Sequence, residues 1–364
     1  MGNKGIRLIV SGGGTGGHLF PGIAVAEAVL DRYPGSQVLF VGTGRQTDER
    51  VLANRKFQAT TISCQGLKGK SVLQRLAALL QLPLSTLSAM RLMKRFRPQL
   101  VLGVGGYVTG PVLLAAKMMG VATCIHEQNS VPGMANRKLG KFVDRIFLSI
   151  PGSERYFAEG KWVLTGNPLR RELIAAAEKK REKKTGQTLL VLGGSQGAHR
   201  VNTLIAGAME IMKKKADHPQ LIHQTGRDDE QMVAVRYKEL GIKAEVAAFF
   251  NNMAELYSRA DLVVSRAGAT TLAEITAFNL PMILIPYPFA ADDHQRKNGE
   301  YLVRGGAAIM FIQEELTEKR LAEEISGLLA DEKRRLQMGQ AAGRLARPDA
   351  TEMIVDQCEK LMFV

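Results

Sequence analysis

The sequence has few cysteines and few aromatic residues. Among its 364 residues there are three Cys and one Trp, and aromatic residues make up 6%. The cysteines stand at positions 64, 124 and 358 without metal-ligand spacing, so the sequence indicates neither a disulfide framework nor a zinc site. No run of about 18 apolar residues occurs, and the N-terminus leads directly into a short apolar segment, so we expect no membrane-spanning helix and no secretion signal. These absences favour a cytoplasmic protein.

Negative charge is scarce in the first half of the chain. Residues 1–168 contain 21 Lys and Arg against 8 Asp and Glu, whereas residues 169–364 contain 28 against 27. Such a basic half could face nucleic acid, anionic lipid or a phosphorylated substrate. The sequence has no helix-turn-helix pattern and no aromatic-rich basic strands, so we expect no nucleic-acid partner.

Apolar segments of strand length alternate with segments of helical periodicity, and the alternation occurs twice. The predicted strands are 6–10, 37–41, 100–104, 122–126 and 145–149 in the first half, and 188–192, 220–224, 244–248, 262–265 and 282–286 in the second. This alternation is typical of βαβ units with parallel strands. A chain of 364 residues is also longer than the chains that usually fold around one hydrophobic core. We therefore predict two Rossmann-like α/β domains, 1–168 and 169–345, and a C-terminal helix over 346–364 that could pack back on the first domain.

Glycine-rich loops follow several of the predicted strands. The first, Gly12-x-Gly14-x-x-Gly17, lies between a strand and a helix, where backbone N–H groups can approach a phosphate. A tight turn without a ligand is the alternative. The second strand ends without the Asp or Glu that would bind a nicotinamide ribose, which disfavours an oxidoreductase. Further loops at 103–111, 193–197 and 266–274 follow other strands, so we expect a ligand that carries phosphates and sugars.

Six motifs together carry a more specific resemblance. They are Gly-Gly-Gly-Thr-Gly-Gly-His-Leu-Phe-Pro-Gly (12–22), Gly-Gly-Tyr-Val-Thr-Gly-Pro (105–111), His-Glu-Gln-Asn (126–129), Thr-Gly-Asn-Pro-Leu-Arg (165–170), Gly-Gly-Ser-Gln-Gly-Ala (193–198) and Arg-Ala-Gly-Ala-Thr-Thr-Leu-Ala-Glu (266–274). In this order they resemble the MurG family, the peptidoglycan N-acetylglucosaminyltransferases of bacteria. The resemblance covers residues 6–310.

The resemblance implies a GT-B fold, in which two Rossmann-like domains face each other across a cleft. It implies an inverting transfer of N-acetylglucosamine from UDP-GlcNAc to the muramoyl 4-hydroxyl of undecaprenyl-pyrophosphoryl-MurNAc-pentapeptide (lipid I), which gives lipid II for peptidoglycan synthesis. The implied partners are UDP-GlcNAc, lipid I, the anionic cytoplasmic face of the cell membrane as a peripheral surface, and proteins of cell-wall synthesis and division. No cofactor is implied.

An inverting transfer needs a base for the acceptor hydroxyl and donors for the leaving pyrophosphate. The resemblance implies His18 as candidate general base, with Asn129 and Glu274 as further catalytic residues. The implied UDP-GlcNAc ligands are Thr15, Gly16, Gly17, Asn129, Arg170, Ser195, Phe250 through its backbone, Ala269, Thr270, Thr271, Leu272, Ala273, Glu274 and Gln295. No Asp-x-Asp occurs, so the pyrophosphate need not be held by a metal. Relatives often carry Gln-Gln where this chain has His294-Gln295, so the sugar contact rests on Gln295 and its register could be off by one.

Structural roles remain open for the three candidate catalytic residues. His18 could be a helix-entry residue bonded to a loop carbonyl, and Asn129 could cap a turn. Glu274 has the spacing of a capping box with Thr271, which would put it at the N3 position of a helix and bond it to the backbone of that helix.

Residues 71–97 combine an apolar stripe with several basic residues. This pattern suits a membrane interface with anionic lipid, and the alternative is two ordinary core helices broken at Pro83. Two other functions also remain open. A different GT-B transferase acting on a membrane lipid such as diacylglycerol would share the loops, and a non-catalytic nucleotide-sugar-binding protein would not need His18.

Overall fold

The computed structural model describes residues 5–13, 16–44, 52, 55, 57–64, 72–179, 187–194, 197–214 and 218–362, with the side chains of 72–80 and 214 left aside. The chain divides into two compact units. Unit 1 comprises Met1–Arg170 together with Pro348–Val364, and unit 2 comprises Arg171–Arg347. In the described part of the chain, no helix has both the length and the apolar character needed to cross a membrane.

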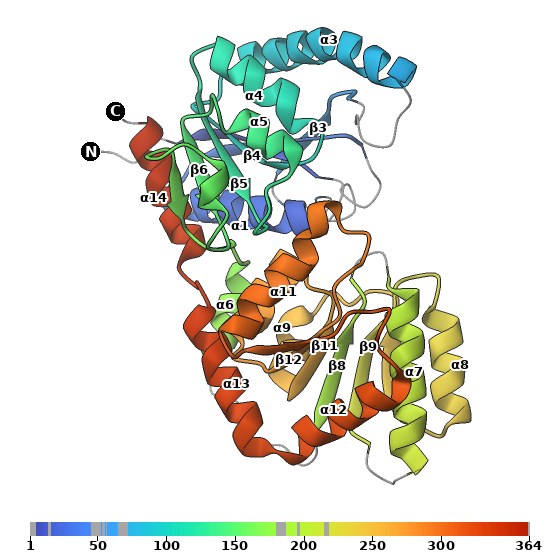
Figure 1. Cartoon of the computed structure of the whole chain (residues 1–364). Helices are drawn as coiled ribbons and strands as arrows, with labels where there is room; N and C mark the ends of the chain where they lie inside the picture. The colour runs from blue at the N-terminus through green and yellow to red at the C-terminus, as the bar shows by residue number, and fades with distance from the viewer. Residues whose placement is uncertain are drawn as a thin grey trace. The chain divides into compact units, whose positions relative to one another are not determined.

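Unit 1 is built on a seven-stranded parallel sheet in the order β3-β2-β1-β4-β5-β6-β7 (Figure 1). The strands are β1 (Arg7–Gly12), β2 (Gln37–Gly42), β3 (Gln58–Thr61), β4 (Leu100–Gly105), β5 (Ala122–Glu127), β6 (Arg145–Leu148) and β7 (Trp162–Leu164). Apolar side chains of α1 (Gly16–Arg32) and α14 (Ala350–Met362) cover one face of the sheet. Those of α3 (Val72–Phe96), α4 (Thr109–Met118) and α5 (Met134–Leu139) cover the other.

The C-terminal helix α14 packs on α1 and on the sheet of unit 1. Arg32 at the end of α1 forms ion pairs with Glu352 and Asp356 of α14. The thiols of Cys124 in β5 and Cys358 in α14 are both buried, with their Sγ atoms 4.0 Å apart. The last helix of the chain therefore completes the core of the first unit.

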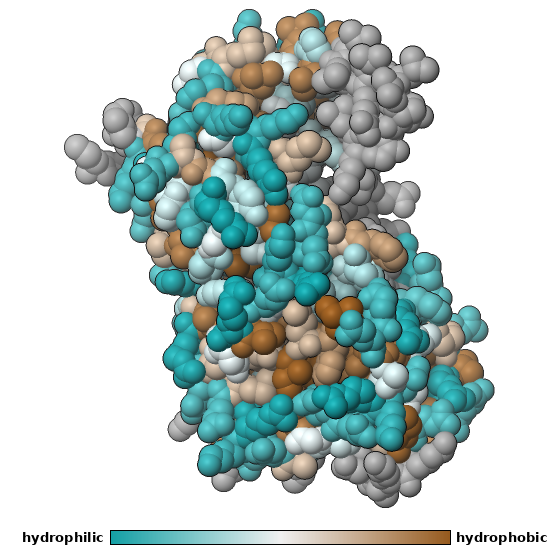
Figure 2. Space-filling model, in the orientation of Figure 1, coloured by the Kyte–Doolittle hydropathy of each residue, from teal (hydrophilic) through white to brown (hydrophobic). Residues whose placement is uncertain are grey.

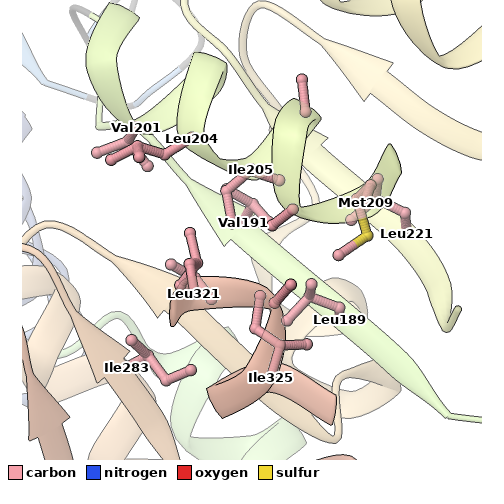
Figure 3. Packing of buried hydrophobic residues seen from close by; sticks show 14 of the residues in the cluster. Leu189, Val191, Val201, Leu204, Ile205, Met209, Leu221, Ile283, Leu321 and Ile325 are labelled. Carbon is pink, nitrogen blue, oxygen red and sulfur yellow. The ribbon is translucent and has the colours of Figure 1, made fainter. Parts of the chain in front are cut away.

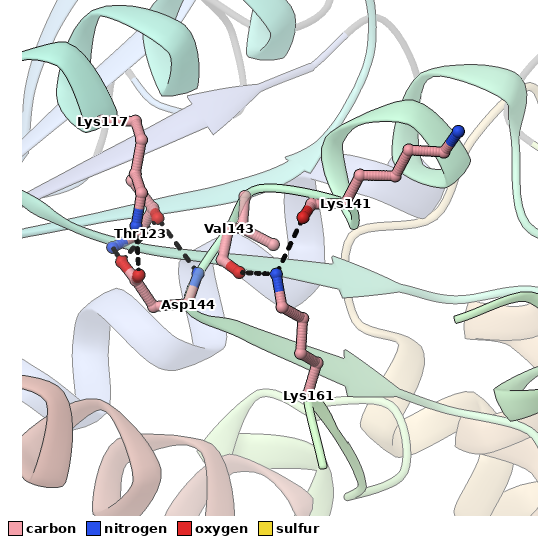
Figure 4. Close-up of polar contacts among 6 residues, drawn as sticks. All are labelled: Lys117, Thr123, Lys141, Val143, Asp144 and Lys161. Atoms are coloured by element: carbon pink, nitrogen blue, oxygen red, sulfur yellow. Dashed lines mark hydrogen bonds and ion pairs between the residues drawn. The ribbon is translucent and has the colours of Figure 1, made fainter. Parts of the chain in front are cut away.

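The amino ends of β5 and β6 are joined by the carboxylate of Asp144 (Figure 4). It accepts hydrogen bonds from the Thr123 backbone N–H at 2.9 Å and from the Thr123 hydroxyl at 2.7 Å, and it pairs with Lys117. Nearby, the Lys161 ammonium donates to the carbonyl of Lys141 at 2.8 Å. These bonds satisfy backbone groups at the edge opposite the glycine loops.

Unit 2 is built on a six-stranded parallel sheet in the order β10-β9-β8-β11-β12-β13. Its strands are β8 (Thr188–Leu192), β9 (Gln220–Gln224), β10 (Ala244–Ala247), β11 (Leu262–Ser265), β12 (Met282–Leu284) and β13 (Ala308–Met310). Its α-helices are α6 (Arg171–Ala177), α7 (His199–Lys214), α8 (Glu230–Glu239), α9 (Met253–Arg259), α10 (Ala269–Ala277), α11 (His294–Arg304), α12 (Glu318–Ala330) and α13 (Glu332–Leu345). Figure 3 shows α7 and α12 packing over β8 through side chains such as Val191, Ile205 and Leu321.

The predicted fold class, two Rossmann-like parallel-sheet α/β domains, is confirmed. Three strands escaped prediction: β3, β7 and β13. Each lies at a sheet edge and has only three or four residues, and none is buried along its whole length. Edge strands of this kind lack the continuous apolar run that identifies a central parallel strand.

The alternative of two helices broken at Pro83 is wrong. Pro83 lies inside the single 25-residue helix α3. After the proline, the hydroxyls of Ser85 and Thr86 donate to the carbonyls of Gln81 and Leu82, each four residues earlier in the helix. A proline within a helix leaves the carbonyl four residues earlier without its backbone N–H partner, and the helix continues here despite that loss.

Candidate functional site

In unit 1, the loops after β1 and β4 approach each other closely enough that only glycine fits. A Cβ atom on Gly12 would lie 2.6 Å from the Gly105 carbonyl oxygen. At Gly105, where φ is +111°, a Cβ would lie 2.7 Å from His18 Nδ1. The imidazole of His18 therefore occupies the space that Gly105 leaves open, and part of the glycine content of these loops serves packing as well as ligand approach.

His18 lies in the first turn of α1 and contacts a glutamine that follows β5. Its Nδ1 is 3.1 Å from Gln128 Oε1. The side-chain nitrogen of Gln128 lies 2.9 Å from the Val104 carbonyl oxygen and 3.1 Å from His126 Nδ1. The Nδ1 atom of His18 therefore contacts a side-chain amide, whereas the structural alternative for this residue named a loop carbonyl.

Glu127 organises the loop that carries Asn129. One carboxylate oxygen accepts from the Asn129 backbone N–H at 2.9 Å, and the other accepts from Asn136 Nδ2 at 2.8 Å. Burial raises the pKa of Glu127, while these bonds act in the opposite direction. The Asn129 side chain also donates to Glu127 at 3.3 Å, so in these bonds the Glu127 carboxylate, and not the Asn129 side chain, accepts from the backbone N–H of the turn.

In unit 2, Glu274 does not occupy the position of a capping box. The helix α10 begins at Ala269 with Gly268 as its N-cap, so Thr271 lies inside the helix and Glu274 is its sixth residue. The carboxylate is buried and accepts a hydrogen bond from the Tyr257 hydroxyl at 2.8 Å. The predicted N3 position is therefore wrong, because the helix starts one turn earlier than the Thr-x-x-Glu spacing suggested.

The N-terminus of α10 has no side-chain cap. Gly268 supplies the N-cap in an extended conformation, without a side chain that could bond the first N–H groups. The predicted donor ligands Ala269, Thr270, Thr271, Leu272 and Ala273 form this first turn and the residue after it. Such a helix end offers N–H groups and positive dipole to an anion.

Two further predicted ligands already have hydrogen-bond partners in unit 2. The backbone N–H of Phe250 donates to Gln224 Oε1 at 3.0 Å. Gln295 Oε1 accepts from the Tyr287 backbone N–H at 2.9 Å, whereas His294 Nδ1 contacts the Ala291 carbonyl at 2.8 Å. The side chains of His294 and Gln295 therefore bond to different backbone groups, the Ala291 carbonyl and the Tyr287 N–H.

The remaining predicted residues lie in unit 1 or outside the described chain. Arg170 is buried, and its guanidinium lies 4.6 Å from the centre of the Phe20 ring. Gly16 and Gly17 begin α1. Thr15 and Ser195 lie outside the described residues. Within the described ranges, no group of three or more His, Cys, Asp or Glu side chains could hold a metal ion.

Sequence reasoning missed two residues that contact the candidate site residues, Gln128 and Tyr257. Gln128 was part of the His-Glu-Gln-Asn motif, and a run of polar residues after a buried strand could have drawn attention to it. Tyr257 is fully buried in α9, seventeen positions before Glu274. No local pattern in the sequence connects those two positions.

The chain is similar to known proteins along nearly its whole length. Residues 8–148 match the glycosyltransferase family 28 N-terminal domain, and residues 188–354 match the glycosyltransferase family 28 C-terminal domain. The chain is 50% identical to the UDP-N-acetylglucosamine--N-acetylmuramyl-(pentapeptide) pyrophosphoryl-undecaprenol N-acetylglucosamine transferase of Desulfotalea psychrophila, over 98% of this chain and 97% of that protein. It is 46% identical to the protein of the same name from Geobacter sulfurreducens, over 97% and 98% of the two chains.

A solved structure agrees with these relatives. The crystal structure of Acinetobacter baumannii MurG is similar with a TM-score of 0.77 and 30% sequence identity, covering 98% of this chain and 99% of that one. The family 28 domains account for both units, and relatives nearly half identical align with almost every residue. The chain therefore belongs to glycosyltransferase family 28.

Proposed function

We propose that this protein is the hexosyltransferase that moves N-acetylglucosamine from UDP-GlcNAc to the muramoyl 4-hydroxyl of lipid I and so forms lipid II for peptidoglycan synthesis. The observation that carries this proposal is the 50% identity, over 98% of the chain, to a transferase whose name states the donor and the undecaprenol-linked acceptor. Sequence identity at this level, along both domains, supports a shared activity as well as a shared fold.

His18 is the residue we propose as general base. An imidazole is mostly neutral near pH 7 and can take a proton from the acceptor hydroxyl as that oxygen attacks the anomeric carbon. The proton moves to the ring, the new glycosidic bond forms with inversion, and UDP leaves with the electrons of the broken bond. Asn129 could orient the hydroxyl, although an amide cannot serve as the base.

The donor pyrophosphate would be held by unit 2. The uncapped first turn of α10 supports this role, because its N–H groups and helix dipole favour the negative charge that develops on the leaving UDP. Glu274 would accept a hydrogen bond from a ribose hydroxyl while Tyr257 holds its carboxylate in place. Arg170 belongs to unit 1, where its guanidinium is buried against Phe20.

We propose that α3 brings the enzyme to the cytoplasmic face of the membrane as a peripheral protein. Leu84 and Leu87 are 65% and 44% exposed, and Arg91, Lys94 and Arg95 are exposed on the same side of the helix. Figure 2 shows hydrophobic and hydrophilic residues side by side over α3, at the top of the view. Apolar side chains flanked by cations suit an anionic lipid surface. We also propose that the membrane-bound enzyme contacts proteins of cell-wall synthesis and division.

A direct assay separates this function from the other lipid transferases. We expect the purified protein to convert a soluble lipid I analogue with UDP-GlcNAc, to use UDP-glucose poorly, and to leave diacylglycerol unmodified. Product formation with diacylglycerol in place of the lipid I analogue would contradict the proposal. UDP-GlcNAc binding without turnover of either acceptor would favour a non-catalytic binding protein.

A further inference from the structure

The side chain of Gln128 can take only one orientation among its neighbours. It is 2% exposed, and one of its two terminal atoms lies 2.9 Å from the Val104 carbonyl oxygen. A carbonyl oxygen only accepts hydrogen bonds, so this terminal atom must be the amide nitrogen. The amide oxygen must then be the atom that lies 3.1 Å from His18 Nδ1.

This orientation has a consequence for the imidazole of His18. The amide oxygen of Gln128 is an acceptor, so the hydrogen bond forms only when Nδ1 of His18 carries the proton. In a neutral ring with the proton on Nδ1, the other nitrogen, Nε2, carries the lone pair. Only the nitrogen with the lone pair can take a proton from a substrate hydroxyl.

We propose that Gln128 is a positioning residue that sets the tautomer of His18, holding the proton on Nδ1 and leaving Nε2 as the basic nitrogen. Val104 acts through its backbone carbonyl, because it fixes which way the amide of Gln128 points. The inference rests on the proposed function only where it concerns catalysis. The tautomer itself is a property of the resting protein.

His126 supports the same arrangement from the other side of Gln128. Its Nδ1 lies 3.1 Å from the Gln128 amide nitrogen and must therefore accept, which requires a neutral ring with its proton on Nε2. Burial keeps this ring neutral, lowering the pKa of His126 to about 4, although the contact of Nε2 with the Gly166 carbonyl acts in the opposite direction.

The hydrogen-bond directions remain consistent beyond His126. Its Nε2 lies 3.0 Å from the Ser149 hydroxyl oxygen, and that hydroxyl donates to Asn167 Oδ1 at 3.4 Å. The hydroxyl can therefore accept from His126 and donate onward. The Val104 carbonyl fixes the direction of Gln128, and the hydrogen bonds of Gln128 then select one tautomer for His18 and one for His126.

The test measures the tautomer of His18 in the resting enzyme by nitrogen NMR of protein labelled with ¹⁵N-histidine. The sequence has six histidines, and the His18→Ala variant identifies the signals of His18. At a pH where the ring is neutral, we expect Nδ1 protonated and Nε2 unprotonated in the wild type. Gln128→Met removes the acceptor at similar volume, and we expect it to shift His18 toward the Nε2-protonated form.

Gln128→Glu provides the conservative replacement. A protonated carboxyl can donate to Val104 and accept from His18, and an ionised one still accepts, so we expect His18 to keep its proton on Nδ1. Asn202→Met is the matched control, because Asn202 in unit 2 is also a buried amide bonded to a histidine, His223. We expect that variant to leave the His18 signals unchanged.

Kinetics connect the tautomer to the reaction. We expect Gln128→Met to lower kcat about 10-fold to 100-fold, less than complete loss of a general base, with the donor KM little changed and Gln128→Glu closer to wild type. A wild-type His18 protonated on Nε2, or a Gln128→Met variant still protonated on Nδ1, would overturn the inference. Wild-type kcat in folded His18→Ala would instead overturn the proposed base and leave the tautomer assignment intact.

Discussion

The position of His18 depends on two residues far from it in the sequence. Gly105 leaves the volume that the ring occupies, and Gln128, 110 positions away, contacts its Nδ1. A side chain at position 105 would displace the imidazole ring of His18. A residue at position 128 without a hydrogen-bond acceptor would no longer hold the proton of His18 on Nδ1. The base proposed for the reaction is therefore held by the carboxyl ends of β4 and β5.

Replacement of His18 by Ala is expected to lower kcat by about 10²–10⁴, the usual contribution of general-base catalysis, with little effect on UDP-GlcNAc affinity. Steady-state rates with a soluble lipid I analogue and calorimetry with UDP measure the two effects. His218→Ala serves as control, since His218 lies in unit 2 and its ring contacts the carbonyl of its neighbour Pro219. Undiminished kcat in a folded His18→Ala protein would assign the base to another residue.

Burial of His126 predicts a loss of stability in mild acid. The unfolded imidazole has its ordinary pKa near 6.5, whereas the folded pKa is about 4. Between these values the unfolded state binds more protons, so the free energy of unfolding decreases as pH falls from about 6.5 to about 4, by at most about 1.4 kcal/mol per pH unit. Above pH 6.5 the contribution is fully present, and below pH 4 no more is lost.

The fluorescence of Trp162, the single tryptophan, reports unfolding of unit 1 in urea at each pH. We expect His126→Gln to flatten the slope between pH 6.5 and 4 relative to wild type, while His218→Gln in unit 2 leaves it unchanged. Glu127, whose pKa burial raises, contributes a slope of opposite sign. The comparison of wild type with variant removes that contribution, and equal slopes would show that His126 is not the titrating group.

Among the helices, α3 has two distinct faces. Ala89 and Met93 are buried in the core of unit 1, whereas Leu84, Leu87 and Arg91 face solvent. A helix that only filled the core would have polar side chains on its solvent face. The core role and the membrane role proposed for this segment are therefore compatible, because they use opposite sides of one helix.

Replacement of Arg91, Lys94 and Arg95 by Ser should weaken binding to anionic vesicles, by up to about 100-fold if each cation contributes about 1 kcal/mol. Sedimentation with vesicles measures this, and calorimetry with UDP should show unchanged donor affinity. The matched control replaces three exposed basic residues of unit 2, Lys319, Lys333 and Arg344. Equal pelleting of the α3 variant and wild type would rule out α3 as the lipid-binding surface.

At the scale of the whole molecule, the two units differ in charge. Unit 1 contains 23 Lys and Arg against 12 Asp and Glu, and unit 2 contains 26 against 23. Acidic residues of α14 reduce the excess of unit 1, and three of them, Glu352, Asp356 and Glu359, pair with Arg32. The excess that remains favours unit 1 as the side that meets anionic lipid, and this attraction should weaken with added salt.

UDP is expected to slow hydrogen exchange in unit 2, most strongly in the first turn of α10, because pyrophosphate bonded there would occupy its N–H groups. UMP, which lacks the second phosphate, should protect this turn less. The Glu274→Ala variant should need more UDP for the same protection. Mass spectrometry of peptides covering residues 268–274 provides the measurement, and protection confined to unit 1 would contradict the assignment of the donor to unit 2.

Sequence patterns alone were enough to predict the fold class and the positions of the glycine loops. Central parallel strands are continuous apolar runs, and glycines mark the turns where chains come close, so both are visible within a few residues. The edge strands β3, β7 and β13 were not visible, because they are short and partly exposed.

The contacts that hold the candidate site residues became visible only in the folded protein. The start of α10 at Ala269 removed Glu274 from a capping box and paired it with Tyr257. The Val104 carbonyl fixed the amide of Gln128, and that amide meets His18. These contacts join strands, helices and loops that are distant in the chain, and a hydrogen bond depends on distance and direction in space, which no local pattern of residues records.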